Sequence, residues 1–331
     1  MKRRVASLFL AVLVLLPLFS SCAPAPHSAV LYNKMNTDVL ITLYSDGRDK
    51  TADELIRSCE ALLDAAEKTL SRTDLTAELS LLNASREATV ALSDTLADML
   101  RLSLSLARET GGAFDPTAGA LSALYDITGD APLPPDPAAL AAAMTCVGHD
   151  SLSLDGNTLT RPVGTVLDFG AIAKGYAAAL LVDHFISEGV AGGVLSLGGN
   201  VAVFGEKSDG SPFRVGVRDP EGGYVGVLSL TGTRFVSTSG AYERFRVGSD
   251  GKTYHHIFDT KTGKPAESDL LSVTVVDEDG ARADALSTAL YVMGYDAAVA
   301  FFEGAERNFD MILVREGGEF FISPGLAFEN A

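Results

Sequence analysis

Helical and strand patterns follow one another along this chain without strict alternation. Apolar spacing predicts helices over residues 53–70, 94–109, 138–144, 175–189, 284–293 and 296–302. Short apolar runs between turns predict strands or hairpins over 30–44, 151–160, 194–197, 201–204, 213–218, 225–230, 234–238 and 311–322. A doubly wound parallel sheet requires regular alternation, so this order favours an α+β fold with mixed or antiparallel sheets flanked by helices. The sequence has no repeat at a fixed period, and we expect one compact domain.

The segment Asp168–Tyr176 is predicted to end an apolar strand and to begin a helix. Gly170 lets a ligand approach the backbone, the first helical turn offers unpaired N–H groups, and Lys174 adds positive charge. This combination predicts a phosphate site. The alternative is that glycine is needed in this turn for backbone geometry alone.

Asp284 and Thr288 are four residues apart in a predicted helix, so their side chains lie on one face. A carboxylate and a hydroxyl at this spacing can share Mg²⁺, which prefers oxygen ligands and leaves other positions to water and phosphate. The alternative is that Asp284 caps the helix and that Thr288 bonds a carbonyl group one turn back.

His256 precedes Asp259 by three residues, in a segment that ends in a Thr-Gly-x-Pro turn. A histidine beside a carboxylate can act as a general base, because the carboxylate raises its basicity and fixes its tautomer. Neighbouring residues of a strand face opposite ways, so at most one of His255 and His256 is expected to enter a site. The alternative is that one histidine faces solvent and the other is packed in a strand.

The N-terminus carries the features of an export signal. Three basic residues precede the apolar run Val5–Phe19, which is short for a membrane span. The next residues resemble a bacterial lipoprotein box with Cys22 as the lipidated residue; a secreted protein with an incidental cysteine is the alternative. We expect attachment to the outer face of the cytoplasmic membrane, or to the periplasmic side of a bacterial membrane. The predicted signal peptide, tether and domain cover residues 1–21, 22–28 and 29–331.

The chain is acidic, with 26 basic and 43 acidic residues and a formal net charge of −17. Removal of residues 1–21 leaves 23 basic and 43 acidic residues, a net charge of −20. Such a chain repels the phosphates of nucleic acid, so we expect no nucleic-acid partner. Cys59 and Cys146 are the remaining cysteines, and an exported protein can either pair them or keep both as packed thiols.

Several motifs resemble the ApbE family of FAD:protein FMN transferases and occur in the order seen there. They are Asp168–Tyr176, Leu197-Gly198-Gly199, Thr238-Ser239-Gly240, His256-Ile257-x-Asp259-x-x-Thr262-Gly263-x-Pro265 and Ala283–Leu290. Ala113–Thr117 and Met35-x-Thr37 are also similar to that family. The resemblance covers nearly the whole mature chain. Members are typically lipoproteins or exported proteins, in agreement with the interpretation of Cys22.

The resemblance implies Mg²⁺-dependent transfer of the FMN half of FAD to a threonine hydroxyl of a target protein, with release of AMP. It implies side-chain metal ligands at Asp284 and Thr288, with the backbone carbonyl of Ala171 as a third ligand. The implied catalytic base is His256. The implied contacts to FAD are Met35, Phe114, Asp115, Lys174, His256 and Asp259. The implied acceptor is an exported flavoprotein subunit, such as those of the sodium-pumping NADH:quinone reductase (Nqr) or of Rnf-type complexes.

Three residues depart from the family pattern. Ala171 replaces a commoner Gly, Asn200 stands where the family often has Asp, and Thr260 stands where Pro is frequent. A backbone-carbonyl ligand tolerates Ala171, whereas Asn200 argues against any role that needs a charge there. Two alternative functions are hydrolysis of FAD to FMN and AMP, when water replaces the threonine, and flavin binding by a non-catalytic surface lipoprotein.

Overall fold

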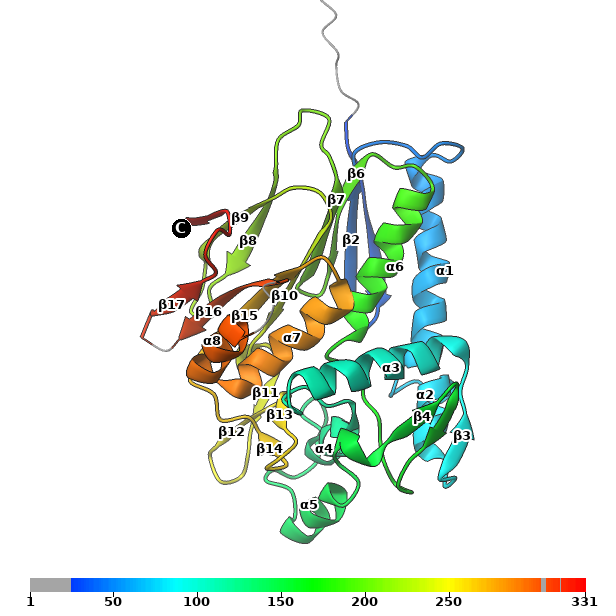
Figure 1. Ribbon diagram of the computed structural model, residues 1–331, viewed down its shortest axis with the longest axis vertical. Helices are drawn as coiled ribbons and strands as arrows, with labels where there is room; N and C mark the ends of the chain where they lie inside the picture. The colour runs from blue at the N-terminus through cyan, green and yellow to red at the C-terminus, as the bar shows by residue number, and fades with distance from the viewer. Residues whose placement is uncertain (1–24, 305–307, 316) are drawn as a thin grey trace, which may run out of the picture.

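The centre of the molecule is an eight-stranded sheet in which neighbouring strands are antiparallel (Figure 1). The computed structural model describes residues 25–304, 308–315 and 317–331. The strands, in spatial order, are β1 (His27–Lys34), β2 (Thr37–Leu43), β6 (Gly192–Leu197), β7 (Asn200–Gly205), β10 (Arg234–Ser239), β15 (Leu270–Asp277), β16 (Asp310–Arg315) and β17 (Phe320–Ile322). The predicted α+β class is therefore confirmed.

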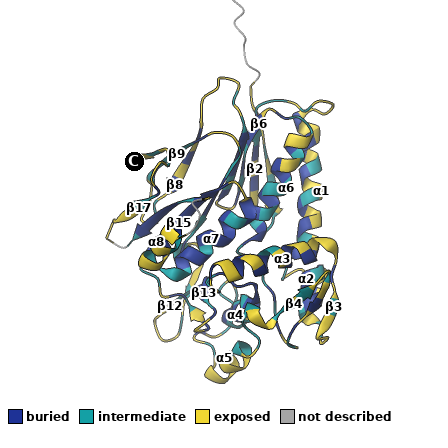
Figure 2. Ribbon diagram, viewed as in Figure 1, coloured by how far each residue is buried: buried dark blue, intermediate teal, exposed yellow. Residues whose placement is uncertain are grey.

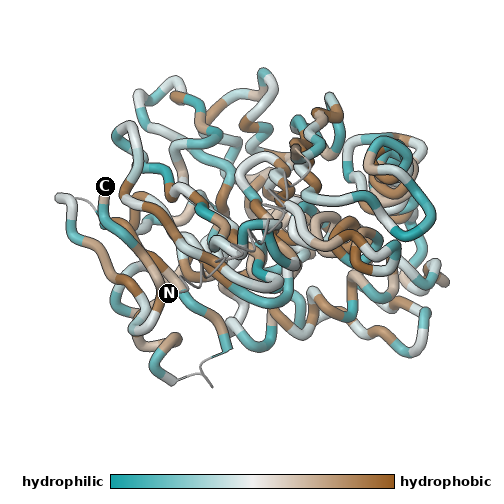
Figure 3. The backbone as a smooth tube through the Cα atoms, turned by 90° about the horizontal axis from the view of Figure 1, so that it is seen from above, coloured by the Kyte–Doolittle hydropathy of each residue, from teal (hydrophilic) through white to brown (hydrophobic). Residues whose placement is uncertain are grey.

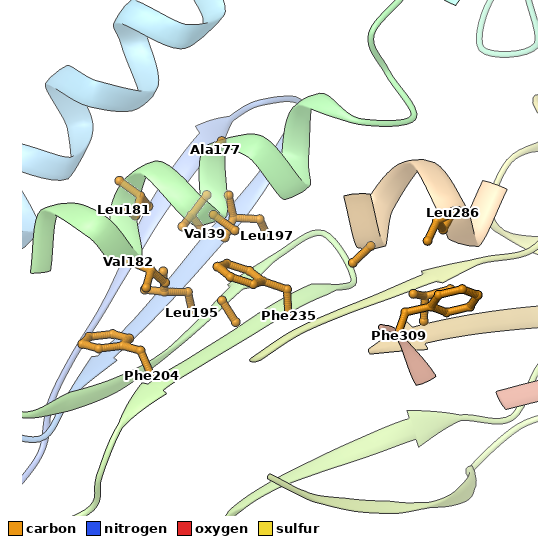
Figure 4. Close-up of a cluster of buried hydrophobic side chains, with 14 of the residues drawn as sticks. Val39, Ala177, Leu181, Val182, Leu195, Leu197, Phe204, Phe235, Leu286 and Phe309 are labelled. Carbon is orange, nitrogen blue, oxygen red and sulfur yellow. The ribbon is translucent and has the colours of Figure 1, made fainter. Parts of the chain in front are cut away.

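Helices cover one face of this sheet (Figure 1). They are α1 (Ala52–Leu70), α6 (Ala173–Ser187), α7 (Gly280–Met293) and α8 (Tyr295–Gly304). Figure 4 shows side chains of α6, such as Val182, facing sheet side chains such as Leu195 and Phe204. In Figure 2 α7 is mostly dark blue and α6 is a mixture of dark blue and teal, so α7 is the more completely buried of the two helices. Burial of these side chains stabilises the layer at roughly 25 cal/mol per Å² of apolar surface.

A smaller sheet covers part of the opposite face of the large sheet. Its strands, in spatial order, are β18 (Phe328–Asn330), β9 (Tyr224–Leu230) and β8 (Phe213–Arg218). Alternate residues of β8, such as Phe213 and Val215, pack with Val203 of β7 and Val236 of β10. Seen from above in Figure 3, many strand segments are brown and many loops are teal, which is the pattern of a layered core.

The remaining elements pack beside one end of the sheet. The helices are α2 (Glu78–Ala84), α3 (Asp94–Glu109), α4 (Gly119–Tyr125) and α5 (Pro137–Met144), with 3₁₀ turns at Pro116–Ala118, His149–Ser151 and Ala241–Glu243. The short strands are β3 (Thr89–Ala91), β4 (Ser153–Asp155), β5 (Thr158–Thr160), β11 (Phe245–Val247), β12 (Thr253–His255), β13 (Phe258–Asp259) and β14 (Lys264–Pro265). Met35 and Met293 pack against both the sheet core and the core around α3, which joins the two parts.

Three expectations about segment boundaries are wrong. The last two residues of the predicted tether belong to β1, where His27 pairs with Leu43. Leu167 is not in a strand; it lies in an irregular segment that leads to α6. Helix α7 begins at Gly280, one turn before the predicted start, because the Asp279 side chain accepts a hydrogen bond from the N–H of Arg282 and caps it. The predicted signal peptide and Cys22 lie outside the described residues.

Both described cysteines are free thiols, which decides between the two possibilities left by the sequence. Cys59 is buried in α1, and this burial raises the pKa of its thiol to about 12. Cys146 follows α5 and is partly exposed. Within the described residues, no helix is both long enough and apolar enough to span a bilayer.

Candidate active site

A cavity of about 400 Å³ opens where the end of the large sheet meets the loops of the second part. Eight segments far apart in the sequence contribute to it, among them the β1–β2 turn, the loop before α6 and the cavity-facing side of α7. Eight of the predicted site residues line it, namely Met35, Phe114, Asp115, Ala171, Lys174, His256, Asp284 and Thr288. The volume is that of a small-molecule site.

The loop before α6 is held by its own side chains. The Asp168 carboxylate accepts hydrogen bonds from the N–H of Gly170 (2.8 Å) and from Nε of Arg72 (3.0 Å). Phe169 is buried, whereas Gly170 is exposed. Lys174 lies in the first turn of α6 and donates to the carbonyl of Gly170 at 3.3 Å. The loop therefore brings Ala171 and Lys174 to the cavity wall.

Helices α6 and α7 touch at their N-terminal ends, and this contact joins the loop to Asp284. A Cβ atom on Gly175 would lie 1.9 Å from the carbonyl oxygen of Gly280, so only glycine fits there. The N–H of Gly175 donates to Oδ2 of Asp284 at 3.0 Å. Asp284 is five residues beyond its helix cap and is 4% exposed, so it is not a cap itself.

We expect Gly175→Ala to destabilise the fold by about 1–3 kcal/mol, because the new methyl group forces α6 and α7 apart. The same separation breaks the hydrogen bond to Asp284, so any activity that depends on the orientation of this carboxylate should fall as well. Urea unfolding and a turnover assay measure both effects. Gly304→Ala is the control, since a Cβ there meets no atom within 4 Å among the described residues. Wild-type stability of Gly175→Ala would contradict the close contact.

Hydroxyl groups surround the two residues predicted as metal ligands. Ser237 lies 3.1 Å from Oδ1 of Asp284, and Ser239 lies 3.2 Å from Oγ1 of Thr288. Ser287 donates to the carbonyl of Asp284 at 2.8 Å. This is the kind of bond to a carbonyl one turn back that was the alternative for Thr288, but Ser287 makes it. Thr288 is partly exposed and lines the cavity. Asp284, Thr288 and Ala171 thus line one cavity. The carboxylate and the hydroxyl, with a backbone carbonyl from Ala171, would form an all-oxygen set that suits Mg²⁺.

Asp115 is held by four internal hydrogen bonds. Its Oδ1 accepts from the N–H and Oγ1 of Thr117, at 2.8 and 2.6 Å. Its Oδ2 lies 2.9 Å from both the backbone nitrogen and Nδ1 of His149. The buried ring of Phe114 precedes it. Asp115 therefore shapes the loop that carries Phe114 into the cavity, and its carboxylate is already engaged by the protein.

The two histidines face different surroundings. His255 ends β12 and is buried, with Nε2 donating to the carbonyl of Ala266 at 3.1 Å. His256 lines the cavity, and its Nδ1 donates to the carbonyl of Arg244 at 3.2 Å, which leaves the Nε2 lone pair free to accept a proton. Burial lowers the pKa of His256 to about 4, although the hydrogen bond to Arg244 acts in the opposite direction.

The expected pairing of His256 with Asp259 is wrong. The Asp259 carboxylate instead accepts from the N–H of Lys261 at 2.9 Å and stabilises the turn between β13 and β14. Asp259 is also missing from the described residues that line the cavity. The N–H of Lys261 is only two residues from Asp259, and this local turn bond is the one that forms.

Among the cavity residues that the sequence did not predict are Glu243 and Glu67. Glu243 follows the Ser239-Gly240 turn, and burial raises the pKa of its carboxyl group while Lys174 acts to lower it. The N–H of Met35 donates to Glu67 at 2.8 Å, and Met35 itself has a left-handed φ of 54°. The described residues hold no group of three His, Cys, Asp or Glu side chains suited to a metal. The predicted donor set contains only one such side chain, so it rests on hydroxyl and carbonyl oxygens.

Comparison with known proteins gives consistent matches. The family model described as "ApbE family" matches residues 35–313. An FAD:protein FMN transferase of Treponema pallidum is 35% identical over 270 residues, covering 75% of this chain and 74% of that protein. One from Klebsiella pneumoniae is 30% identical over 306 residues, covering 90% and 91%.

Solved structures agree with the sequence matches. The ApbE protein of Thermotoga maritima superposes with a TM-score of 0.83 at 29% identity, covering 91% of this chain and 97% of that one. The apo form of the flavinyl transferase ApbE of Pseudomonas stutzeri gives 0.79 at 28% identity, covering 92% and 95%. From the family model, the relatives and the shared fold, the chain belongs to the ApbE family.

Proposed function

We propose that this chain transfers FMN from FAD to a threonine hydroxyl of an exported flavoprotein subunit, such as those of Nqr or Rnf-type complexes, and releases AMP. The observation that supports this most directly is the meeting of Ala171, Asp284 and Thr288 with Lys174 and His256 on one cavity. Relatives that bear the name FAD:protein FMN transferase, at up to 35% identity, support the same reaction.

The proposed roles follow from the chemistry of each group. Ala171, Asp284 and Thr288 would hold Mg²⁺, which neutralises charge on the FAD diphosphate when bound. Lys174 adds a second positive charge in a protein whose overall charge would repel an anion. Nε2 of His256 accepts the proton of the threonine hydroxyl. The threonine oxygen then bonds to the FMN phosphorus, and the bond from that phosphorus to the oxygen bridging to AMP breaks.

The decisive experiment incubates the protein with FAD, MgCl₂ and a candidate acceptor subunit. Transfer predicts a mass increase of one FMN on the acceptor, covalent flavin fluorescence in a denaturing gel, and one AMP per flavin attached. An acceptor whose target Thr is replaced by Val is the control. Free FMN formed equally with and without acceptor would instead support FAD hydrolysis, and no turnover of any kind would support flavin binding alone.

The pH dependence of kcat/KM should reflect the low pKa of His256. Its neutral form is the base, and with a pKa near 4 rather than the usual 6.5 the ring stays neutral down to about pH 5. We therefore expect no loss of kcat/KM from pH 7.5 to 5.5 and an acid limb below that range. Initial rates at saturating Mg²⁺ measure it. An acid limb centred near pH 6.5 would contradict the buried, neutral base.

We also propose export and lipid attachment at Cys22. The support is the sequence of residues 1–22, because these residues lie outside the described part of the chain. Cys22→Ala is expected to move the protein from the membrane fraction to the soluble fraction, since no basic patch adjoins the anchor. Cell fractionation with an antibody measures this. A variant that stays in the membrane fraction would show that the lipid is not the anchor.

A further inference from the structure

Ser237 stands between two side chains that compete for its single hydrogen. Its Oγ is 2.7 Å from Oδ1 of Asn200 and 3.1 Å from Oδ1 of Asp284. Both of those atoms are acceptors, yet a hydroxyl group donates only one hydrogen. All three residues are at least 96% buried, so water does not relieve the conflict.

The Asn200 amide resolves this conflict when its two ends exchange places. Its Nδ2 is buried and has no hydrogen-bond partner among the described residues. With Nδ2 directed at Ser237, the amide donates to the hydroxyl, and the hydroxyl is then free to donate to Asp284. The oxygen and nitrogen of an amide are assigned by the hydrogen bonds they make, and only this orientation satisfies both Ser237 and Asp284.

In this relay, Asn200 donates to Ser237 and Ser237 donates to Asp284, which fixes one of the contacts of the Asp284 carboxylate. One oxygen of its carboxylate accepts from the N–H of Gly175 and the other accepts from Ser237. Two donors from different elements, α6 and β10, hold the carboxylate in one orientation and leave one further lone pair on each oxygen. Groups that orient a metal ligand in this way commonly change metal affinity by about 10- to 100-fold when they are removed.

We propose that Asn200 is a positioning residue that acts through Ser237 to aim the Asp284 carboxylate at a divalent cation. This inference rests on the cation site of the proposed function. A buried amide with one end unpaired is destabilising, and an apolar residue would avoid this cost if the position were purely structural. An amide at position 200 donates a hydrogen bond and carries no charge. An aspartate there would add a negative charge near Asp284 and Glu243 and, when ionised, could not donate.

Mn²⁺ binding to the mature protein, followed by electron paramagnetic resonance, tests the relay without any turnover. We expect Asn200→Ala and Ser237→Ala each to weaken Mn²⁺ binding about ten-fold. Because Asn200 acts through Ser237, the double variant should bind no more weakly than Ser237→Ala alone. Ser272→Ala is the matched control, since Ser272 is another buried strand serine whose hydroxyl has no partner among the described residues. Melting temperatures in EDTA identify any variant that fails to fold.

The outcomes separate this inference from the proposed function. Wild-type affinity in Asn200→Ala would overturn the relay while leaving the cation site intact. Losses that multiply in the double variant would also overturn it, because Asn200 would then act independently of Ser237. If the wild-type protein bound no Mn²⁺ at all, the proposed cation site would fall, and the relay with it.

Discussion

Replacing Asp284 by alanine is expected to reduce FAD turnover by about 10³-fold, equivalent to about 4 kcal/mol of transition-state stabilisation. Asp284 supplies the one carboxylate among the three predicted cation ligands, and it is buried with only two neutral donors for partners. Its removal takes away the negative charge that would hold Mg²⁺ against the FAD diphosphate. Initial rates of AMP release across a range of Mg²⁺ concentrations measure the loss.

A loss of stability must be distinguished from this loss of chemistry. Asp279→Ala is the matched control, because Asp279 caps the same helix α7 but lies outside the described cavity lining. We expect that variant to lose about 1 kcal/mol of stability and to keep its turnover. Asp284→Asn, which keeps the shape and removes the charge, should resemble Asp284→Ala in turnover. If Asp284→Ala released AMP at the wild-type rate, the metal assignment would be wrong.

Local features of the fold were predictable because their causes lie within a few residues. Helix α1 begins one residue before its predicted start, since Thr51 and Glu54 form a reciprocal capping box ahead of a regular apolar stripe. Helix α3 matches its predicted bounds, with Ser93 as the cap. The order of strands was not predictable, since β2 pairs with β6 and β10 pairs with both β7 and β15, across long separations in sequence.

The segment before Asp168 shows why an apolar run can mislead. Leu167 is fully buried, which the sequence suggested, but its backbone is not paired with a strand. The side chain of Asn83 instead satisfies the backbone of Leu167. It donates to the Leu167 carbonyl and accepts from the Leu167 N–H, both at 2.8 Å. An asparagine 84 residues away can mimic a neighbouring strand, and spacing alone carries no sign of it.

In the candidate site, too, local relationships were predictable from the sequence and contacts between distant segments were not. The spacing of Asp284 and Thr288 placed both side chains on one helical face, and the structure brings that face to the Ala171 loop. Glu243 and the bond from Asn200 to Ser237 depend on contacts between distant segments, so spacing did not reveal them. The site residues implied by the family resemblance all line the cavity except Asp259, which stabilises a turn instead.

Replacing His256 by alanine is expected to slow FMN transfer by about 10²- to 10⁴-fold, which is the usual contribution of a general base. The ring lines the cavity, and its Nδ1–H is held by the Arg244 carbonyl, so Nε2 is the atom that accepts the threonine proton. Binding of FAD should change little, because a neutral ring contributes no charge to holding the diphosphate. Single-turnover transfer to the acceptor and equilibrium FAD binding measure the two effects separately.

His255→Ala is the matched control, because His255 is one residue away and is buried at the end of β12. Its ring donates to the Ala266 carbonyl and accepts from the N–H of Ile257, so the variant should lose about 1–3 kcal/mol of stability while the folded protein keeps its transfer rate. Equal losses of FAD affinity and transfer rate in His256→Ala would make that ring a binding contact. A large loss of transfer in folded His255→Ala would reverse the assignment, because a buried ring bonded on both nitrogens has no lone pair to offer the acceptor threonine.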